Sequence, residues 1–600
     1  MTQDDSIVYH RTHITSDGLQ EAQLFLTADT DLREKRILAY SPNIIPIIFI
    51  PGVMGTNLCS KDHPGRSIPL PVWRPPNMDF RGILETLCAL FTYWNKTPAD
   101  RQRELHWEYV EVDPTGPIDS HQAKLPEVLL RQRGWGALLR QSYHPIMGKL
   151  QHDLNHIMEL GKVLPHWQQY SQHHPADYGD SKDNRPLTHA ELAHAARYRF
   201  DVWAAGYNWL QDNERSARDI IHYIDNRVLA WYTQHHLAAH KVILVTHSMG
   251  GLVSRAITAI HHYDKILGVV HGVEPSAGAP ATYKRMRAGF EGAASIILGN
   301  EGAASIILGN DAAEVTAVLA TAPGPLQLLP MPDYHDGQPW LMLRDTHTDR
   351  LLLRLPTTPG RAYEEIYASP AWYGLIPANH DHLINPAKLE LAEHKTSITS
   401  HSQERTTPAT PREHFLNTLK QVHAFHQKLT GRYHPETYVY FGIEGQPLAE
   451  RQVSGKGRHT HPIILTDRRT WGEIIWEGAR LDPTVDWQRA TLDAHAHNGT
   501  VQGCGRTLRI ASPSVPGDGT VPFLSSSASV PHAKAAFAHG CRQPGRYNRE
   551  RPGFDSEGFP GYDHQDSYND TRAQFATLYS VIKLASQAQW GMPSSARTPT

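Results

Sequence analysis

Short apolar runs dominate the hydrophobic pattern of this chain and predict buried β-strands. Each run is rich in β-branched residues and stops at turn-forming residues, which is typical of strands. Apolar residues are continuous in these runs rather than alternating with polar ones. We therefore expect both faces of each strand to be covered, as in a parallel sheet. The five runs are 44–50, 200–205, 241–245, 266–273 and 437–441.

Between these runs, apolar residues recur at the spacing of an α-helix. One such stripe lies within 216–236, and a second helix follows the run 241–245 directly, at 252–261. A third stripe, within 575–582, lies near the end of the chain. Alternating strands and helices indicate βαβ units, so the sequence predicts an α/β fold with a mostly parallel, doubly wound sheet.

Two long segments interrupt this core. Strand–helix connections in such cores are normally about 2–6 residues long, so these segments are expected to be inserted subdomains. Loops leave the ligand-binding edge of the sheet, and we therefore expect both insertions to fold as caps over the site. The expected division is three core segments, two caps and a flexible tail: core 1–75, cap 76–195, core 196–282, cap 283–435, core 436–590 and tail 591–600.

The strongest chemical signal follows the run 241–245. The residues THSMG at 246–250 join that strand to a helix and match the G-x-S-x-G nucleophile elbow, with Thr246 in place of the first glycine. The serine of such an elbow occupies a strained turn, so its neighbours two positions away must be small. The sequence therefore predicts that Ser248 is a nucleophile.

A second signal, PGVMG at 51–55, follows the first apolar run. Acyl-transfer hydrolases hold the oxyanion with two backbone N–H groups, one directly after the nucleophile and one in the loop after an early strand. We assign these groups to Met249 and Val53, and Met54 is the alternative to Val53.

Four stretches together resemble a known branch of α/β-hydrolases, that of lecithin–cholesterol acyltransferase and the PGAP1-like proteins. They are PGVMGTNL, GYNWLQDN, THSMGG and SAGAP. The resemblance covers the three core segments and not the insertions. It implies an α/β-hydrolase fold with two inserted caps and serine-dependent cleavage of lipid acyl esters. The same branch includes antibacterial type VI secretion lipase effectors, which are large, carry caps and have no signal peptide.

The acid of a Ser–Asp–His triad is expected after the nucleophile. Asp518 lies in PGDGTVP, which resembles the GDGTVP loop that carries the acid in this family. The rival is Glu274, which ends the strand after the nucleophile helix.

The base is expected between Asp518 and the last helix. His532, His539 and His564 satisfy this order. We favour His564 because it lies in a loop rich in Gly and Asp, immediately before the apolar helix, where this architecture presents its histidine.

These assignments predict a mechanism without metal or cofactor. His564 takes the proton of Ser248, which attacks an ester carbonyl, while Asp518 orients the imidazole and water completes the cycle. The sequence shows no cluster of ligands with metal-binding spacing.

Composition narrows the class of protein further. The 600 residues include 58 Lys and Arg against 61 Asp and Glu, a net charge of −3, which argues against a nucleic-acid binder. The 38 histidines would gain charge on mild acidification. Cys59, Cys88, Cys504 and Cys541 are too few for a disulfide framework or a zinc site, although one bridge remains open.

Targeting signals are not evident in the sequence. The N-terminal residues show neither the basic nor the apolar region of a secretory signal peptide. No run approaches the roughly 18 apolar residues that span a bilayer. We therefore expect no transmembrane segment and export by a route other than general secretion.

A tandem repeat of EGAASIILGN occupies 291–300 and 301–310. It is either a recent duplication in a tolerant loop or a doubled apolar lid surface, formed by 296–298 and 306–308.

The favoured function is a phospholipase that acts as an antibacterial effector. It would be cytoplasmic in its producer and hydrolyse membrane phospholipids at the membrane or in the periplasm of a target cell. A secretion spike protein and a cognate immunity protein are its expected partners. One alternative is an intracellular lipid acyltransferase or lipid-anchor deacylase of the same fold. Another is a binding module with an inactive hydrolase fold, against which the candidates for all five site roles argue.

Overall fold

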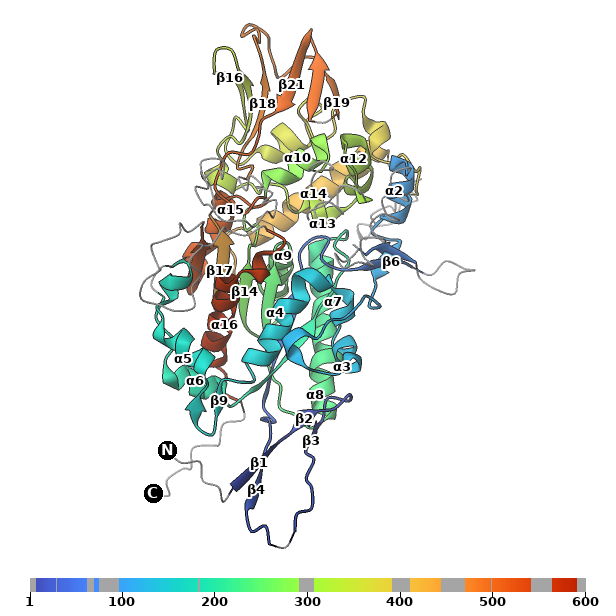
Figure 1. The fold of residues 1–600 in the computed structure, drawn as a ribbon. Helices are drawn as coiled ribbons and strands as arrows, with labels where there is room; N and C mark the ends of the chain where they lie inside the picture. Colours follow the sequence, from blue (N-terminus) through green and yellow to red (C-terminus); the bar gives the residue numbers. More distant parts are fainter. Residues whose placement is uncertain are drawn as a thin grey trace, which may run out of the picture.

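The centre of the molecule is a seven-stranded sheet (Figure 1). The structure is a computed structural model, and it describes residues 7–28, 30–61, 70–74, 96–181, 184–290, 307–390, 410–443, 470–497, 499–540 and 564–590. Six strands are parallel, and β11 pairs antiparallel with β22 at one edge. In spatial order the strands are β11 (Asp180–Ser181), β22 (Ala535–His539), β17 (Thr437–Gly442), β14 (Ile266–Gly272), β13 (Val242–His247), β5 (Ile44–Ile50) and β12 (Arg199–Ala204).

Helices cover both faces of this sheet, which is why its strands are apolar throughout. Along β5, Ile48 and Ile50 belong to one buried cluster and Ile47 and Phe49 to another, because successive side chains point to opposite faces. The first cluster includes residues of α7 (Asn213–Tyr223), η4 (Ile224–Leu229), α8 (Ala230–Gln234), α9 (Gly250–Arg255) and η5 (Ala256–Ile260). The second includes residues of α3 (Glu127–Gln132), α4 (Arg140–Asp153), α5 (Pro165–Gln172), α6 (His189–Ala195) and α16 (Thr571–Ala585).

The structure differs from the expectation that 76–195 forms a cap. Helices α3 to α6 pack on the sheet instead, and Trp135, Ile146 and Trp167 share a cluster with β5. A parallel sheet must be covered on both faces, and this segment supplies most of the cover on one of them. Within its described part, α2 (Pro98–Glu104) lies apart and contacts α12 (Ala312–Leu319) of the second insertion.

A second sheet, of six strands, lies above the first in Figure 1. Its strands come from both sides of the boundary expected at residue 435, so that boundary is wrong: residues 474–510 belong with the second insertion. The reason is the parallel pairing of β15 with β18, which joins strands far apart in the sequence. In spatial order the strands are β16 (Arg350–Leu355), β15 (Leu341–Asp345), β18 (Ile474–Gly478), β21 (Arg506–Ile510), β20 (Thr500–Gly503) and β19 (Asp493–His497).

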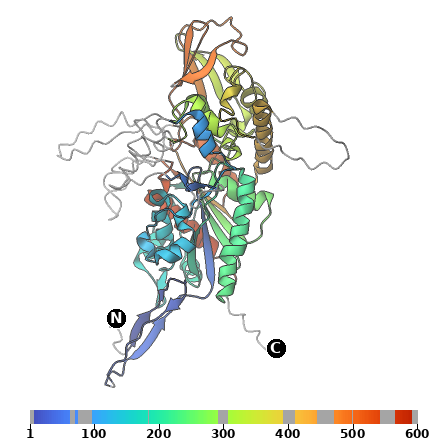
Figure 2. The same cartoon turned by 90° about the vertical axis from the view of Figure 1, so that its right-hand side faces the viewer.

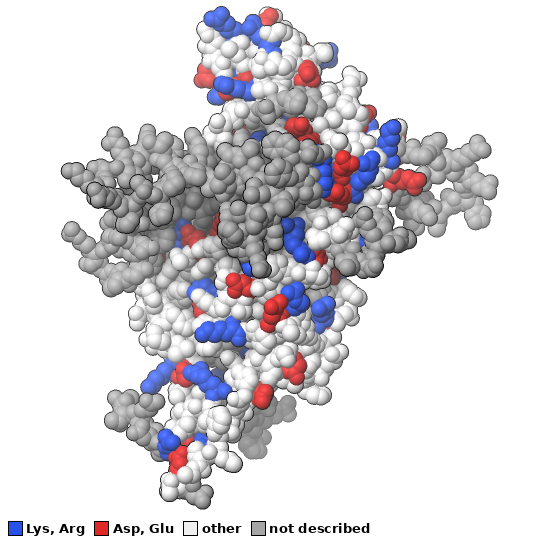
Figure 3. Space-filling view, turned by 45° about the vertical axis from the view of Figure 1, so that its right-hand side comes forward, with Lys and Arg blue, Asp and Glu red and all other residues white. Residues whose placement is uncertain are grey.

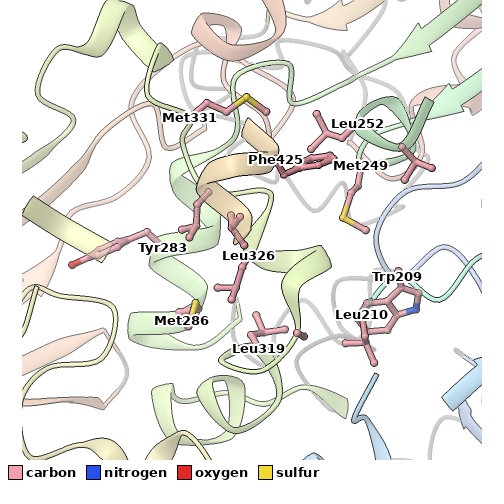
Figure 4. Packing of buried hydrophobic residues seen from close by; sticks show 14 of the residues in the cluster. Trp209, Leu210, Met249, Leu252, Tyr283, Met286, Leu319, Leu326, Met331 and Phe425 are labelled. Atoms are coloured by element: carbon pink, nitrogen blue, oxygen red, sulfur yellow. The ribbon is translucent and has the colours of Figure 1, made fainter. Parts of the chain in front are cut away.

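Helices join this second subdomain to α9, the helix that follows Ser248. They are α10 (Pro280–Ala288), α12, α13 (Pro323–Leu326) and α14 (Pro411–Leu429). Figure 4 shows Met249 and Leu252, at the start of α9, near Phe425 of α14, and all three belong to one buried cluster. Ile307 and Leu308, from the second copy of the repeat, are buried in the same cluster. The first copy, 291–300, and residues 301–306 of the second copy lie outside the described residues.

Smaller elements complete the fold. Strands β1–β4 project from the end of the molecule opposite the second sheet (Figure 2). The remaining strands are β1 (Ile7–Arg11), β2 (His13–Ile14), β3 (Gln20–Glu21), β4 (Glu34–Leu38), β6 (Leu58–Ser60), β7 (Pro71–Trp73), β8 (Val110–Val112), β9 (Met158–Glu159) and β10 (Lys162–Val163). Short helices are η1 (His121–Ala123), η2 (Trp135–Ala137), η3 (Pro175–Tyr178), η7 (Tyr334–Gly337), η8 (Tyr363–Tyr367), η9 (Asp381–Leu383), α15 (Phe523–Ser526), η11 (Ser527–His532) and η12 (Ser567–Asn569).

The surface charges and the cysteines are consistent with the balanced charge and the low cysteine content of the sequence. Basic and acidic side chains are interspersed on the face shown in Figure 3. Of the helices in the described residues, none is long and apolar enough to cross a membrane. Cys59 is a buried free thiol and Cys504 an exposed one. Cys88, Cys541 and the tail 591–600 lie outside the described residues.

Several histidines are buried in the fold and held neutral. Burial lowers the pKa of His106, His144 and His426 to about 4 and that of His247 to about 3. In an unfolded chain the same groups have a pKa near 6.5. Below that pH the unfolded chain therefore binds protons that the folded chain does not take up.

We expect the free energy of unfolding to fall as the pH decreases from 7 to 5. Once the pH is below about 6.5, each buried histidine contributes a loss of roughly 1 kcal/mol per pH unit, until the pH reaches its folded pKa. Urea unfolding at constant ionic strength measures this slope. His426→Gln should reduce the slope, and His382→Gln, at an exposed position, should leave it unchanged. Stability that is independent of pH over this range would contradict the expectation.

Candidate active site

Ser248 occupies a strained turn between β13 and α9. Its backbone is left-handed, with φ 52°, a conformation that residues other than glycine rarely adopt. The turn leaves no room beside it: a Cβ atom at Gly250 would lie 2.5 Å from the carbonyl oxygen of Ile50, and one at Gly251 would lie 2.4 Å from Cγ of Glu274. The two glycines after the elbow are therefore required by close packing.

Thr246, the departure from the elbow pattern, is accommodated by a polar contact. Its Oγ1 lies 3.2 Å from Nδ1 of His271 on the neighbouring strand β14. Its carbonyl oxygen accepts a hydrogen bond of 2.8 Å from the hydroxyl of Tyr568. A β-branched residue is therefore compatible with this elbow.

The structure brings Ser248, Asp518 and His564 into one chain of hydrogen bonds. His564 Nδ1 lies 2.8 Å from Oδ2 of Asp518, and His564 Nε2 lies 2.8 Å from Oγ of Ser248. Because the carboxylate can only accept, Nδ1 carries the proton and Nε2 accepts from the serine hydroxyl. All three residues are buried, with exposed fractions of 4% for Ser248, 1% for Asp518 and 6% for His564. The arrangement can transfer a proton from the serine to the imidazole.

The PGDGTVP loop holds Asp518 by its backbone. Oδ1 of Asp518 accepts the N–H groups of Thr520 at 3.1 Å and Val521 at 2.7 Å, which leaves Oδ2 for the histidine. Gly519 makes this turn possible with a left-handed φ of 92°. The backbone N–H of His564 also donates to the carbonyl oxygen of Asp518, at 3.0 Å. These bonds fix both ends of the Asp518–His564 pair.

The oxyanion groups expected from the sequence belong to the loop after β5 and to the residue before α9. Neither Val53 nor Met249 donates its N–H in a hydrogen bond within the described residues. Val53 and Met54 line the same pocket as Ser248. Met54 is left-handed, with φ 63°, and its carbonyl oxygen accepts a 2.7 Å hydrogen bond from Nε1 of Trp73. Among the described residues, the two N–H groups assigned from the sequence therefore have no hydrogen-bond acceptor.

The rival acid Glu274 has other partners. It forms a buried ion pair with Arg255, at 3.4 Å, and accepts a hydrogen bond of 2.9 Å from the hydroxyl of Ser276. Its side chain packs against Gly251 of α9. Glu274 therefore supports the elbow from behind, and the structure does not bring it to His564.

The rival histidines also lie elsewhere. His532 stacks on Tyr433, with ring centroids 4.8 Å apart, and His539 stacks on Tyr440 at 5.7 Å. Neither is among the described residues that line the pocket of Ser248.

The pocket at Ser248 contains residues that no sequence motif singled out. They come from the end of β7, from the residue before α4, from the second insertion and from the residue after His564: Trp73, Leu139, Arg285, Phe290, Leu328 and Gln565. Most of the lining is apolar. These positions depend on how distant segments pack, so local sequence carried no signal for them. Among the described residues, no group of His, Cys, Asp and Glu side chains could hold a metal ion.

Comparisons with known proteins agree with this architecture. The family description PGAP1-like alpha/beta domain matches residues 185–291, which include the nucleophile elbow. The crystal structure of the Tle4–Tli4 complex contains a chain that is 35% identical to this one, with a TM-score of 0.73. The match covers 91% of this chain and 99% of the other. No curated protein sequence is significantly similar to this chain. The predicted α/β-hydrolase fold class and the PGAP1-like resemblance are confirmed.

Substitution of the two candidate acids separates their roles. Asp518→Asn should lower kcat on a soluble p-nitrophenyl ester by about 10⁴-fold, because the amide cannot hold the imidazole in the required tautomer. Folded Glu274→Gln should keep most of its activity. This variant should have a lower free energy of unfolding, because Arg255 is left with an uncompensated buried charge. Steady-state kinetics with thermal unfolding of each variant measure both effects. An inactive, folded Glu274→Gln beside an active Asp518→Asn would reverse the assignment.

Proposed function

Because this chain belongs to the Tle4 family of α/β-hydrolases, we propose that it is a serine-dependent lipase that hydrolyses acyl esters of membrane phospholipids. The observation that carries the proposal is the buried hydrogen-bond chain from Asp518 through His564 to Ser248, which opens into a mostly apolar pocket. Such a chain activates a serine for attack on an ester, and an apolar pocket suits an acyl chain.

The proposed mechanism uses only groups of this chain and water. Ser248 attacks the ester carbonyl as its proton passes to Nε2 of His564. The N–H groups of Val53 and Met249 hold the oxyanion, and Asp518 stabilises the imidazolium. His564 then gives the proton to the leaving alcohol. Water then attacks the acyl-enzyme as its proton passes to His564, and His564 returns that proton to Oγ of Ser248 as the fatty acid leaves.

A phospholipid, rather than a neutral lipid, is favoured by Arg285. Its side chain lines the pocket of Ser248, and its guanidinium lies 5.0 Å from the ring centroid of Phe290, another lining residue. Guanidinium groups bind phosphate through two parallel hydrogen bonds. We propose that Arg285 binds the phosphate of the substrate while the acyl ester lies at Ser248.

The second insertion is proposed to act as a cap. It contributes Arg285, Phe290 and Leu328 to the pocket, and Ser248 is only 4% exposed. An enzyme that works on a bilayer benefits when apolar surface is exposed only at the membrane, because large exposed patches promote aggregation in water.

The biological setting is proposed from the relative. Tle4 has been crystallised in a complex with Tli4. By analogy, we propose that this chain is an antibacterial effector delivered by a type VI secretion system into target cells, where it attacks membrane phospholipid from the periplasm. A secretion spike protein would carry it, and a cognate immunity protein would bind and inhibit it in the producer.

Ser248→Ala should abolish the release of free fatty acid from vesicles of phosphatidylethanolamine and phosphatidylglycerol, because no other group can form the acyl-enzyme. Triad knockouts retain only about 10³–10⁴-fold of acceleration over water. Fatty acid release is measured on the purified chain, with circular dichroism to verify the fold. Retained release in Ser248→Ala would refute the proposal. Transfer of the acyl group to another lipid, without free fatty acid, would favour the acyltransferase alternative.

Arg285→Gln should lower kcat/KM for phospholipids by roughly 10-fold or more, because a hydrogen bond to a charged group contributes about 1.5–3 kcal/mol. Hydrolysis of p-nitrophenyl butyrate, which has no phosphate, should change little. Lys284→Gln is the matched control: its Nζ donates to the carbonyl oxygen of Gly289 at 3.1 Å, and it is absent from the described pocket lining. An equal loss of kcat/KM on both substrates would show that Arg285 does not bind the phosphate.

A further inference from the structure

His247, the residue before the nucleophile, has a closed set of hydrogen bonds. Its Nε2 lies 2.9 Å from the backbone carbonyl oxygen of His564, and its Nδ1 lies 3.1 Å from the hydroxyl of Tyr143. A carbonyl oxygen can only accept, so Nε2 carries the proton. Nδ1 then has a free lone pair and accepts the Tyr143 O–H. Burial, together with nearby His564, lowers the pKa of His247 to about 3, so the ring stays neutral.

The hydroxyl of Tyr143 joins three other segments of the site. It accepts the backbone N–H of Gly52 at 3.3 Å and an N–H of the Gln565 side chain at 3.3 Å, while donating its own proton to His247. Tyr143 is fully buried, and burial raises its pKa to about 12, so the hydroxyl keeps its proton. One oxygen atom therefore links the oxyanion loop, the nucleophile strand and the residue after the base.

The glycines of the PGVMG loop make room for this pair of side chains. A Cβ atom at Gly52 would lie 2.8 Å from Nδ1 of His247, and one at Gly55 would lie 2.6 Å from the hydroxyl of Tyr143. The ring of Tyr143 also packs against Phe49 of β5, with centroids 5.1 Å apart. Loop, strand and helix α4 are thus built around this contact.

We infer that Tyr143 and His247 are positioning residues for the proposed hydrolysis. Tyr143 selects the His247 tautomer that donates to the carbonyl oxygen of His564, and the same hydroxyl holds the oxyanion loop at Gly52. The inference rests on the proposed function, because it assigns a base to His564 and an oxyanion site to the loop. Neither residue contacts the reacting atoms. Segment α4, which the sequence placed in a cap, thereby acts on the base and the oxyanion loop.

The tautomer of His247 explains how the Tyr143 hydroxyl affects the position of His564. Without the Tyr143 hydroxyl, only the carbonyl oxygen of His564 holds the proton of His247 on Nε2, and Nδ1 loses its donor. If it moved to Nδ1, a lone pair would face the carbonyl oxygen of His564 and repel it. A displacement of about 1 Å at a catalytic group reduces rate by roughly 10²-fold. Loss of the network should therefore reduce kcat more than it reduces substrate binding.

Tyr143→Phe is the first test. It should lower kcat for p-nitrophenyl butyrate by roughly 10- to 100-fold, with KM changed little. The rate of covalent labelling of Ser248 by a fluorophosphonate should fall by a similar factor. Tyr579→Phe on α16 is the matched control, since it also removes a buried phenol with a 2.8 Å hydrogen bond, to the carbonyl oxygen of Arg185. Unchanged kcat and labelling in folded Tyr143→Phe, or an effect on KM alone, would overturn the inference.

Two substitutions of His247 test which of its bonds matters. His247→Gln keeps an N–H near the place of Nε2, so it can still donate to the carbonyl oxygen of His564. His247→Asn keeps an acceptor for Tyr143 but has no group that reaches that carbonyl. The glutamine variant should be clearly more active than the asparagine variant at equal amounts of folded protein. Equal activities, or the reverse order, would contradict the inference.

Ser248→Ala separates the two proposals. An inactive Ser248→Ala with fully active Tyr143→Phe would retain the serine mechanism and overturn only the positioning role. An active Ser248→Ala would overturn the proposed function itself.

Discussion

The left-handed turn at Ser248 is the constraint on which the rest of the site depends. A serine with φ 52° projects from the end of β13 only if the chain on every side approaches it closely. Gly52, Gly250 and Gly251 provide that approach, because a side chain at any of them would collide with the elbow or its neighbours. The strain is held by burial: Ser248 lies between the loop after β5, the start of α9 and the second subdomain, with almost no exposed surface. A flexible turn would not keep its hydroxyl on the imidazole.

Covering a parallel sheet on both faces explains where the long insertions go. Helices that follow the strands directly cover one face, as α7 to α9 do here, and α16 covers part of the other. The remaining apolar surface needs α3 to α6, which come from the segment 96–195. The second insertion is not needed to cover the central sheet, and it forms a separate sheet with residues 474–510. Its helices share a hydrophobic cluster with α9, so a movement of this subdomain would change the packing next to Ser248.

The polar groups of the site are matched almost one to one in a buried region. Both oxygens of Asp518 accept hydrogen bonds, one from two backbone N–H groups and one from His564. His247 uses both ring nitrogens, and Tyr143 uses its hydroxyl as donor and acceptor. In a low-dielectric interior each hydrogen bond is strong, and each polar group without a partner destabilises the fold. The directions of the protons are therefore set before any substrate arrives.

The sequence by itself determined the fold class and five of the central strands, and it named a candidate elbow and a candidate serine, acid and base in that order. These features depend on local physics: continuous apolar runs, small residues around a strained turn and an Asp-Gly turn. Asp518 and His564 could be named because motif and order restrict them. Only the tertiary structure decided that α3 to α6 cover the sheet, that 474–510 joins the second subdomain, and that Tyr143 reaches His247. Those contacts join residues far apart in the chain. Sequence periodicity shows that a surface is apolar, but it does not show which distant surface will cover it.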